Sequence, residues 1–356
     1  MKSPAISSHA KSLTDSIMTW YSSNYRDLPW RSTKDPYIIW LSEIILQQTR
    51  ISQGLPYFEK FRDQYPSIHD LASAEESEVL KLWQGLGYYS RARNLHHTSK
   101  IISKEMNGTF PNTYKELLKL KGVGKYTAAA IASICFDEKV PAIDGNAFRV
   151  LSRLFAINKD IASSSSFSLF FETGQSIMPE ENTGFFNQAI MDLGSMICLP
   201  TKPKCDICPV QVFCLAKKKN LINSLPVKIN KLKIKSRSLN YFIIKCDDSI
   251  LIKQRLNKDI WQGLFEFLLV EESSIGNILD ESKVIYRSDT IEHRLTHQKL
   301  SLTFSMVEVK RKWFDSIEKD YNMKSIVVSE IGNFAVPKPI EQFLKTADLL
   351  LNSDLN

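Results

Sequence analysis

Residues 120–128 read Leu-Lys-Gly-Val-Gly-Lys-Tyr-Thr-Ala and lie between two segments with helical patterns. Before them, Thr113 and Glu116 have the spacing of a capping box, which predicts a short helix over Tyr114–Leu120. After them, an Ala-rich segment predicts a second helix that ends near Cys135. Two glycines allow the backbone between the helices to turn tightly and to approach another molecule closely. The stretch therefore predicts a helical hairpin whose turn faces a partner.

The second helix of this hairpin begins at the turn, so its free N–H groups form a site for an anion. The residues that would lie along phosphates are Gly122, Val123, Gly124 and Lys125. A G-x-G sequence alone is weak evidence, because any turn between helices can contain it. The capped helix before it, the helix after it and the adjacent lysine favour a helix-hairpin-helix motif, which holds a DNA backbone without reading its sequence.

A second informative segment surrounds Glu43, within residues 38–48. Asp35 and Pro36 have the residue types of an N-cap and a first helical residue, and the helix after them is apolar on nearly every side. A carboxyl group on a buried helix loses hydration, so its pKa should rise and it can act as a general acid near neutrality. The alternative is that Glu43 pairs with a buried arginine.

Asp144 directly precedes a segment with helical periodicity, so it is predicted to be an N-cap. Backbone N–H groups and the helix dipole would hold its carboxylate ionised. An ionised carboxylate can stabilise a sugar cation or attack it, whereas a protonated Glu43 can supply a proton. One charged and one protonated carboxyl group is the arrangement used in glycosyl-bond cleavage.

Four cysteines follow the pattern C-x6-C-x2-C-x5-C within residues 198–214, namely Cys198, Cys205, Cys208 and Cys214. Soft sulfur ligands at this density favour an iron–sulfur cluster or zinc. Structural zinc sites usually contain two C-x2-C pairs, and only one is found here, so the spacing favours a cluster without excluding zinc. Local disulfides suit secreted chains, and the polar N-terminus does not indicate a signal peptide.

Composition and charge limit the number of cores, the class of partner and the cellular location that the chain can have. The 356 residues carry a formal net charge of +7 and are 43% hydrophobic, which favours a polyanionic partner and allows at least two cores. The sequence contains no apolar run that indicates a membrane span, so no membrane partner is expected. Reduced thiols and the absence of an export signal predict an intracellular protein, for which a bacterial cytoplasm is the default expectation and a eukaryotic origin is the alternative.

The sequence pattern changes near residue 216. Residues 1–216 have helical periodicity, with Gly and Pro between the helical runs. Residues 217–239 contain eight basic residues and no acidic one, which predicts a linker that is either solvated or lies along phosphates. Residues 240–352 predict an α+β domain, with strands at Tyr241–Cys246, Ile250–Arg255, Leu264–Val270, Lys283–Arg287 and Leu300–Val309 and helices near Trp313–Tyr321 and Pro339–Leu351.

Several further motifs occur in order along the chain: Leu28-Pro29-Trp30-Arg31, residues 40–49, residues 83–94 and Phe186-Asn187-Gln188-Ala189, followed by the four cysteines. Together with the hairpin and the two carboxylates, they resemble the helix-hairpin-helix DNA glycosylases, and within that group the adenine DNA glycosylases of the MutY family. The match covers most of the chain. The resemblance implies a mainly α N-terminal glycosylase domain with a [4Fe–4S] cluster, and an α+β Nudix-like C-terminal domain.

The resemblance also implies a base-excision-repair enzyme, expected to be a monomer, that binds double-stranded DNA. It would flip out adenine paired with 8-oxoguanine or guanine and hydrolyse the N-glycosidic bond. Glu43 would protonate adenine at N7, Asp144 would stabilise the sugar cation, and Tyr126 and Asn146 would orient the site. The adenine pocket would be lined by Arg26, Trp30, Arg31, Leu46 and Gln188. The 8-oxoguanine would be surrounded by Gln48, Thr49, Leu86 and Tyr88, with Leu86 as an apolar wedge.

One position separates two activities. Related endonuclease III-like enzymes carry a catalytic lysine where this chain has Tyr126, and that lysine nicks the strand through a Schiff base. Lys125 lies one residue earlier, so its side chain should point elsewhere, and we expect a monofunctional glycosylase. The alternatives are an endonuclease III-like glycosylase and lyase for oxidised pyrimidines, or a non-catalytic iron–sulfur DNA-binding module, which would need neither Glu43 nor Asp144.

The segment Trp261–Phe267 resembles the Nudix-like domain of the family, but the R-E-x-x-E-E core of Nudix hydrolases is absent after Gly263. The domain is therefore expected to recognise 8-oxoguanine rather than to cleave nucleotides. The family's recognition loop is often Phe-Ser-His, and Leu295-Thr296-His297 corresponds to it here, with Thr supplying the hydroxyl. The alternative for His297 is an ordinary exposed histidine. Some relatives have Glu at position 188, whereas Gln188 can hold a water but cannot take its proton.

Overall fold

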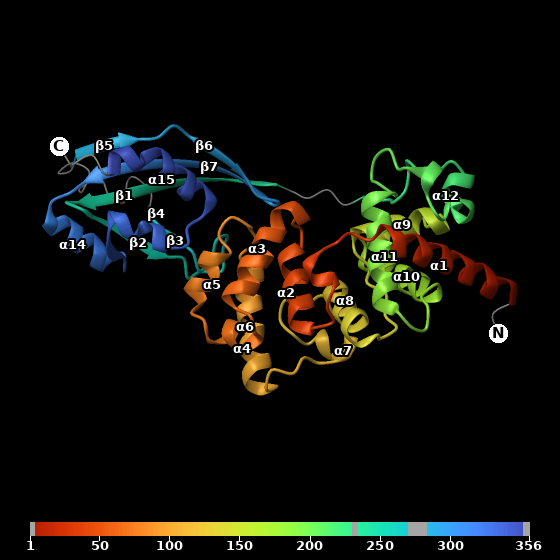
Figure 1. The fold of residues 1–356 in the computed structure, drawn as a ribbon. Coiled ribbons are helices and arrows are strands. Elements are labelled where there is room, and N and C mark those ends of the chain that lie inside the picture. Colours follow the sequence, from red (N-terminus) through yellow and green to blue (C-terminus); the bar gives the residue numbers. More distant parts are fainter. Residues whose placement is uncertain (1–3, 230–233, 270–282, 352–356) are drawn as a thin grey trace. The chain divides into compact units, whose positions relative to one another are not determined.

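The structure is a computed structural model that describes residues 4–229, 234–269 and 283–351 (Figure 1). The chain forms two compact units. The first contains Met1–Ala72 and His97–Asn230, and the second contains Ser73–His96 and Lys231–Asn356. Besides a division near residue 230, residues 73–96 therefore group with the C-terminal part of the chain. Among the described residues, no helix is both long and apolar enough to cross a membrane.

The first unit is helical, as predicted. Its longer helices are α1 (Pro4–Asn24), α2 (Pro36–Leu46), α3 (Ile51–Gln64), α8 (Lys125–Phe136), α9 (Gly145–Phe155), α10 (Ser164–Ser176) and α11 (Thr183–Met196). Shorter elements are the 3-10 turns η1 (Pro29–Arg31), η2 (Cys205–Ile207) and η3 (Gln211–Phe213), with α7 (Tyr114–Leu117) and α12 (Leu215–Lys218). Helices α4 (Ile68–Ser73) and α6 (Ser90–Glu105) each have residues in both units, and α5 (Glu76–Leu82) lies in the second.

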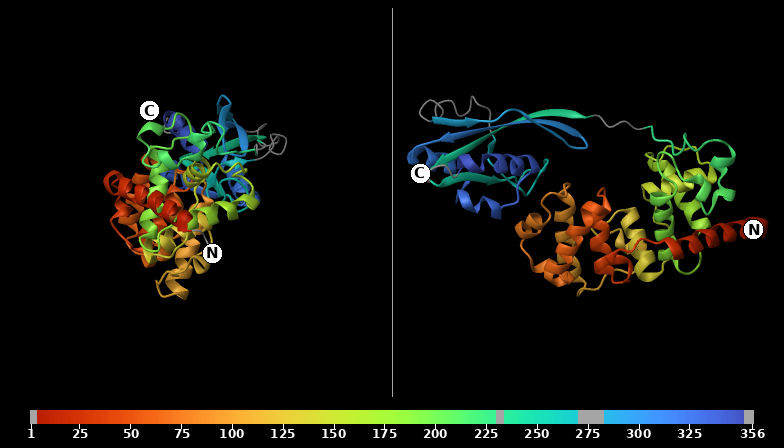
Figure 2. Two further views of the ribbon diagram at one scale, coloured as in Figure 1. Left: turned by 90° about the vertical axis from the view of Figure 1, so that its right-hand side faces the viewer. Right: turned by 45° about the horizontal axis from the view of Figure 1, so that its top comes forward.

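Helix α11 is at the centre of the part that carries the candidate site, because it packs against α1, α8 and α9 (Figures 1 and 2). The shared core includes Ile17, Leu151, Phe170 and Phe186, all essentially without solvent exposure. A glycine allows α11 to approach α8 closely: a Cβ atom on Gly184 would lie 2.5 Å from the Cα atom of Ile134. This close packing brings side chains of α8, α9 and α11 toward one region.

The predicted hairpin is present, although its first helix is shorter than expected. Helix α7 ends at Leu117 rather than Leu120, and Gly122 adopts the left-handed conformation (φ 83°) that allows the chain to turn back. Only half of the predicted capping box forms. The Thr113 hydroxyl accepts a hydrogen bond from the Glu116 N–H, but the Glu116 carboxylate binds Lys119 instead of reaching back to the cap.

The second unit contains a mixed eight-stranded sheet. Its long strands are β1 (Lys235–Cys246) and β7 (Gln298–Glu308), which lie side by side and run parallel (Figure 2). The other strands are β2 (Ser249–Gln254), β3 (Phe265–Glu266), β4 (Leu268–Leu269), β5 (Lys283–Arg287), β6 (Ile291–Arg294) and β8 (Lys324–Val327). The helices are α14 (Arg311–Asp320) and α15 (Lys338–Leu351), with the 3-10 turn η5 (Val328–Asn333), and Phe343 of α15 stacks on Phe304 of β7 at 4.3 Å.

The α+β prediction for this unit is confirmed, with differences in detail. Strand β1 begins at Lys235, so the last residues of the predicted linker pair with β7 instead of remaining extended in solvent. Residues 230–233 of that linker and Val270 lie outside the described residues. The predicted run from Leu264 is divided into β3 and β4, and the short strands β6 and β8 were not predicted.

Candidate active site

One cleft of about 1010 Å³ in the first unit brings together most of the residues that were predicted from the sequence. It lies among η1, α2, the hairpin, the start of α9 and α11. Its volume is enough for a nucleoside-sized ligand. Val123 does not line it, and its side chain is buried. The predicted residues that do line it are Arg26, Trp30, Arg31, Glu43, Leu46, Gln48, Thr49, Gly122, Gly124, Lys125, Tyr126, Asp144, Asn146 and Gln188.

Glu43 lies on the cleft side of α2, and this helix begins as predicted. The Asp35 carboxylate accepts a hydrogen bond of 2.9 Å from the Tyr37 N–H, and Pro36 is the first helical residue. Burial raises the pKa of Glu43 to about 7, and the negative charge of Asp144 acts in the same direction. A hydrogen bond from Tyr126 and the charge of Arg31 oppose this rise. Glu43 is therefore a buried acid that exchanges its proton near neutrality.

Asp144 is the N-cap of α9, as predicted. Its carboxylate accepts hydrogen bonds from the Ala147 N–H at 2.7 Å and from the Asn146 side chain at 2.8 Å. The net effect on its acidity differs from the prediction. Burial raises the pKa of Asp144 above its usual value, and the hydrogen bonds from Ala147 and Asn146 only oppose that rise. The carboxylate is thus desolvated as well as hydrogen-bonded.

Tyr126 and Lys125 leave the first turn of α8 in different directions. The Tyr126 hydroxyl forms a hydrogen bond with Glu43, and its oxygen lies 3.1 Å from the sulfur of Met191. Burial and the neighbouring carboxylates raise the pKa of Tyr126 well above its usual value, so the phenol keeps its proton. The ammonium group of Lys125 lies over the Phe167 ring, 4.2 Å from its centroid. Lys125 also contributes to the lining of the cleft, so its orientation relative to the reacting sugar stays a prediction.

The sequence did not reveal Asp192, which is fully buried on α11 beneath the cleft. It accepts hydrogen bonds from Arg26 and Arg31, so the buried-arginine alternative proposed for Glu43 applies to Asp192 instead. Burial alone would raise the pKa of Asp192, but the two arginines lower it below its usual value. The only signal in the sequence is an acidic residue inside an apolar helical run, and that pattern does not name its partners. Met191 and Ser195 of the same helix also line the cleft and were missed.

A chain of hydrogen bonds extends from Asp144 along α9. Asn146 accepts a hydrogen bond of 2.7 Å from Arg149, and Arg149 also donates to the carbonyl oxygens of Cys198 at 2.7 Å and Gly194 at 2.6 Å. Helix α11 makes room for this arrangement, because a Cβ atom on Gly194 would lie 2.6 Å from the Cβ atom of Asn146. Asn146, which donates to Asp144, is therefore itself held by the hydrogen bond from Arg149 and by close packing against Gly194.

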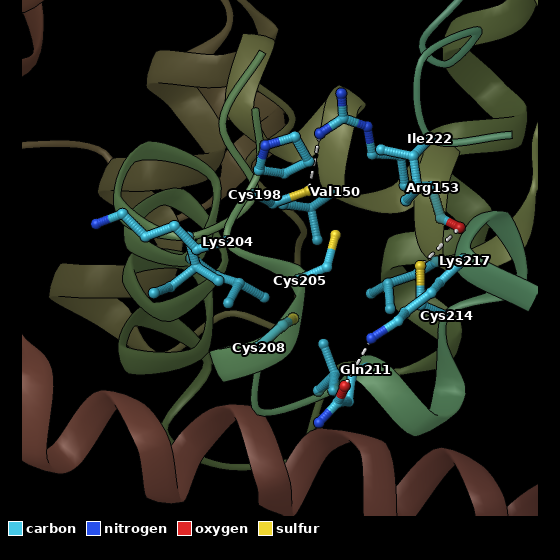
Figure 3. A pocket seen from close by; sticks show the side chains of 15 residues that line it. Val150, Arg153, Cys198, Lys204, Cys205, Cys208, Gln211, Cys214, Lys217 and Ile222 are labelled. Carbon is cyan, nitrogen blue, oxygen red and sulfur yellow. Dashed lines mark hydrogen bonds between the residues drawn. The ribbon is translucent and has the colours of Figure 1, made fainter. Parts of the chain in front are cut away.

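The four predicted cysteines surround one hollow beside α9 (Figure 3). The Cys198 sulfur accepts a hydrogen bond of 3.4 Å from Arg153, and Arg153 also donates to the carbonyl oxygens of Leu199 and Pro200. The rest of the hollow is largely apolar, lined by residues such as Val150 and Ile222. In the described part of the chain, no group of three or more His, Cys, Asp or Glu side chains is already arranged to hold a metal ion.

The chain is similar to known proteins over most of its length. The family model described as HhH-GPD superfamily base excision DNA repair protein matches residues 41–170, and the NUDIX domain model matches residues 240–346. The adenine DNA glycosylase of Buchnera aphidicola subsp. Baizongia pistaciae is 38% identical over 288 residues, which cover 79% of this chain and 82% of that protein. This chain belongs to the adenine DNA glycosylase family.

A second relative agrees with this assignment to the adenine DNA glycosylase family, and a solved structure agrees with the fold of its glycosylase domain. The adenine DNA glycosylase of Buchnera aphidicola subsp. Acyrthosiphon pisum is 34% identical over 92% of this chain and 95% of its own length. A solved thermostable thymine-DNA glycosylase is 30% identical and matches with a TM-score of 0.56, covering 60% of this chain and 99% of that one. The predicted combination of a helix-hairpin-helix glycosylase fold and a Nudix-like α+β domain is confirmed.

The remaining predicted site residues of this adenine DNA glycosylase family member lie in the second unit. Leu295-Thr296-His297 forms the turn between β6 and β7, and Thr296 and His297 are exposed. The Thr296 hydroxyl is hydrogen-bonded to the hydroxyl of Tyr88, which is also exposed and has a positive φ of 48°. Leu86 is buried, with an exposed fraction of 6%. Within this unit, Tyr88 and the predicted recognition loop are thus direct neighbours.

Proposed function

We propose that this chain is a monofunctional base-excision-repair enzyme that hydrolyses the N-glycosidic bond of adenine in DNA. The observation that carries the proposal is a pair of carboxyl groups that line one cleft, the buried Glu43 and the half-buried Asp144. Membership of the adenine DNA glycosylase family supports adenine as the base. Because the acid is buried, a base inside a duplex could reach it only after being flipped out of the stack.

The two carboxyl groups would divide the chemistry. With a pKa of about 7, Glu43 is partly protonated at neutral pH and would donate its proton to N7 of adenine, which makes the base a better leaving group. Asp144 would stabilise the positive charge that develops on the sugar as the bond breaks. Ala147 and Asn146 hold its carboxylate in place, and Tyr126 holds Glu43.

The absence of a lyase step is proposed from Tyr126. A phenol has no amine nitrogen and cannot form a Schiff base with the sugar, and the ammonium group of Lys125 is placed over Phe167. Hydrolysis would then end at an abasic site with an intact strand. Gln188 lines the cleft and could hold a water molecule but cannot accept its proton, so that proton would go to Asp144.

The hairpin provides the proposed contact with the DNA backbone. Gly122 turns the chain, and Gly124 caps α8 without any side-chain hydrogen bond, which leaves backbone N–H groups free for a phosphate. Double-stranded DNA is the proposed partner, bound by a monomer. Its place of action would be the nucleoid in the bacterial cytoplasm.

We also propose that the four cysteines hold a [4Fe–4S] cluster. The donor set is all sulfur, the four side chains share one hollow, and Arg153 supplies a hydrogen bond to one sulfur, so the residues fit this group. When bound, the cluster would tie residues 198–214 into one structure. Replacing Cys205 by Ser should abolish iron and acid-labile sulfide content, whereas replacing Cys135 by Ser, outside the group, should not. Stoichiometric zinc in place of iron would contradict this proposal.

Recognition of 8-oxoguanine is assigned to the second unit. The support is the match of residues 240–346 to the NUDIX domain model and the exposed turn that carries Thr296 and His297. Leu86 and Tyr88 of the same unit would contact the lesion. Replacing Thr296 by Ala should lower the rate on an 8-oxoguanine·adenine duplex more than on a guanine·adenine duplex. An equal loss on both duplexes would contradict a recognition role.

The decisive experiment is single-turnover base release from a duplex that holds one 8-oxoguanine·adenine pair, beside a duplex that holds thymine glycol. Each product is analysed with and without alkali. We expect adenine release and strand breakage only after alkali. Nicking without alkali, or reaction of thymine glycol alone, would contradict the proposal. Binding of both duplexes without any release would indicate the non-catalytic alternative.

A further inference from the structure

Two residues that do not line the cleft support the part of its wall that is formed by Arg26, Arg31 and Gln188. These are Asp192 of α11 and Tyr21 of α1. Both are buried, and each lies more than 160 residues away in sequence from a side chain that it contacts. Their contacts determine which hydrogen-bonding groups this wall can offer to a base.

Asp192 fixes the two arginines. Its Oδ1 atom accepts hydrogen bonds of 2.8 Å from Nε of Arg26 and of 2.8 Å from Nη2 of Arg31. Its Oδ2 atom accepts from Nη1 of Arg31 at 2.5 Å and from the Arg26 backbone N–H at 3.3 Å. Both carboxylate oxygens are therefore occupied, and Asp192 has no acceptor left for a base. The Asp192 side chain is fully buried, and charge-assisted hydrogen bonds of this kind are stronger than bonds between neutral groups.

Tyr21 fixes the amide of Gln188. Its hydroxyl donates to Oε1 of Gln188 at 3.0 Å, and the guanidinium of Arg31 lies 5.5 Å from the centre of its ring. Burial raises the pKa of Tyr21 to about 12, so the hydroxyl keeps the proton that it donates. Because this bond fixes the amide oxygen toward Tyr21, the NH2 group is the end of Gln188 that is left to face a ligand in the cleft.

We propose that Asp192 and Tyr21 are positioning residues that hold Arg26, Arg31 and Gln188 as a wall of hydrogen-bond donors against the base. This inference rests on the proposed function. The ring nitrogens N1, N3 and N7 of adenine are all acceptors, so a wall of donors matches them. Hypoxanthine carries N1–H and would present a donor where adenine presents an acceptor, and two facing donors leave both unpaired.

Tyr21→Phe tests whether Tyr21 fixes the orientation of the Gln188 amide, because the substitution removes only the hydroxyl that donates to it. The exposed Tyr25, which directly follows the same helix, supplies the matched control Tyr25→Phe. Single-turnover release is measured for adenine and for hypoxanthine, each opposite 8-oxoguanine in the same duplex. We expect Tyr21→Phe to release adenine about tenfold more slowly and to lower the adenine-to-hypoxanthine ratio about tenfold, with unchanged DNA affinity. The control should keep both rates.

Asp192→Asn tests whether the negative charge of Asp192 holds Arg26 and Arg31. The ionisable groups that act on Glu43 are Tyr126 of α8, Asp144 before α9 and Arg31 of η1. Without the Asp192 charge, Arg31 would favour the ionised form of Glu43 more strongly. The basic limb of the pH–rate profile should then move about one unit lower. Asp63→Asn, an exposed carboxylate of α3, is the control and should keep the wild-type profile.

The outcomes separate this inference from the proposed function. If the wild-type chain releases no adenine, the proposed function is wrong, whatever the variants do. If the wild type is active and Tyr21→Phe keeps the wild-type ratio, the positioning role of Tyr21 is wrong. Equal losses at every pH in Asp192→Asn would reduce Asp192 to a structural role. If Asp192→Asn does not fold, which thermal unfolding would reveal, Tyr21→Phe alone still decides whether the wall selects the base.

Discussion

The buried Glu43 and the half-buried Asp144 line the same cleft, and desolvation raises the pKa of both, yet their surroundings differ. Glu43 is in the middle of α2, where the backbone N–H groups are used by the helix itself, and its hydrogen bond comes from Tyr126. Asp144 is at the start of α9, where a free backbone N–H and the Asn146 amide bind its carboxylate. The position of each carboxyl group in its helix therefore helps to separate the acid from the stabilising carboxylate.

Replacing Glu43 by Gln should have the largest effect, because it removes the proton donor but keeps the shape of the side chain. We expect adenine release to fall at least about a thousandfold while DNA affinity stays near that of the wild type. Single-turnover release and a binding titration on the same duplex measure the two quantities. A loss of less than about tenfold would show that the proton comes from elsewhere.

Replacing Asp144 by Asn should lower the rate by about a few hundredfold, through the loss of charge beside the sugar. The Asn side chain can still accept a hydrogen bond from the Ala147 N–H, so α9 should keep its cap and the melting temperature should change little. A large drop in thermal stability with only a modest loss of rate would mean that Asp144 is mainly a cap.

The pH dependence should follow Glu43. Its pKa is raised to about 7, so the protonated acid is lost as the pH increases through that value. We expect the rate of adenine release to fall about tenfold for each pH unit above about 8. A pH–rate profile of single-turnover release measures this limb. A rate that remains constant up to pH 9 would contradict the assignment of Glu43 as the acid.

Gly194→Ala should displace Asn146, which donates to Asp144, and leave the surroundings of Glu43 unchanged. The added Cβ atom would meet Asn146 at 2.6 Å, and Asn146 donates to Asp144. We expect about a tenfold loss of rate and reduced thermal stability, even though Ala is usually favourable in a helix. Gly332→Ala, where an added Cβ atom meets nothing within 4 Å, is the control. Wild-type activity in Gly194→Ala would indicate that Asn146 has room to adjust.

The smallest effect is expected for Tyr126→Phe. The Tyr126 hydrogen bond lowers the pKa of Glu43, so its removal should raise that pKa and move the basic limb of the pH–rate profile to higher pH. The shift should be about half a unit, with a change in maximal rate of only a few-fold. Movement of the limb to lower pH would show that Tyr126 supports the protonated form instead.

The features that could be predicted from the sequence are those set by neighbouring residues. The caps at Asp35 and Asp144, the buried helix that carries Glu43 and the hairpin turn at Gly122 each depend on a few consecutive residues. Asp192 could not be predicted to bind Arg26, because the two are 166 residues apart and only the packing of α11 brings them together. The short strands β6 and β8 were missed because four residues carry too little of an alternating pattern.

The pairing of β1 with β7 has a consequence for how the chain is made. The two strands pair in parallel from Lys235 with Gln298 to Lys245 with Glu308, so each pair spans 63 residues of sequence. During synthesis, which runs from the N-terminus, one long edge of β1 has no strand to bind until residue 308 has left the ribosome. A chain that stops before β7 would keep that edge open to pairing with other molecules. Premature termination within these residues should therefore yield an aggregating product, even when every residue of the catalytic cleft has been made.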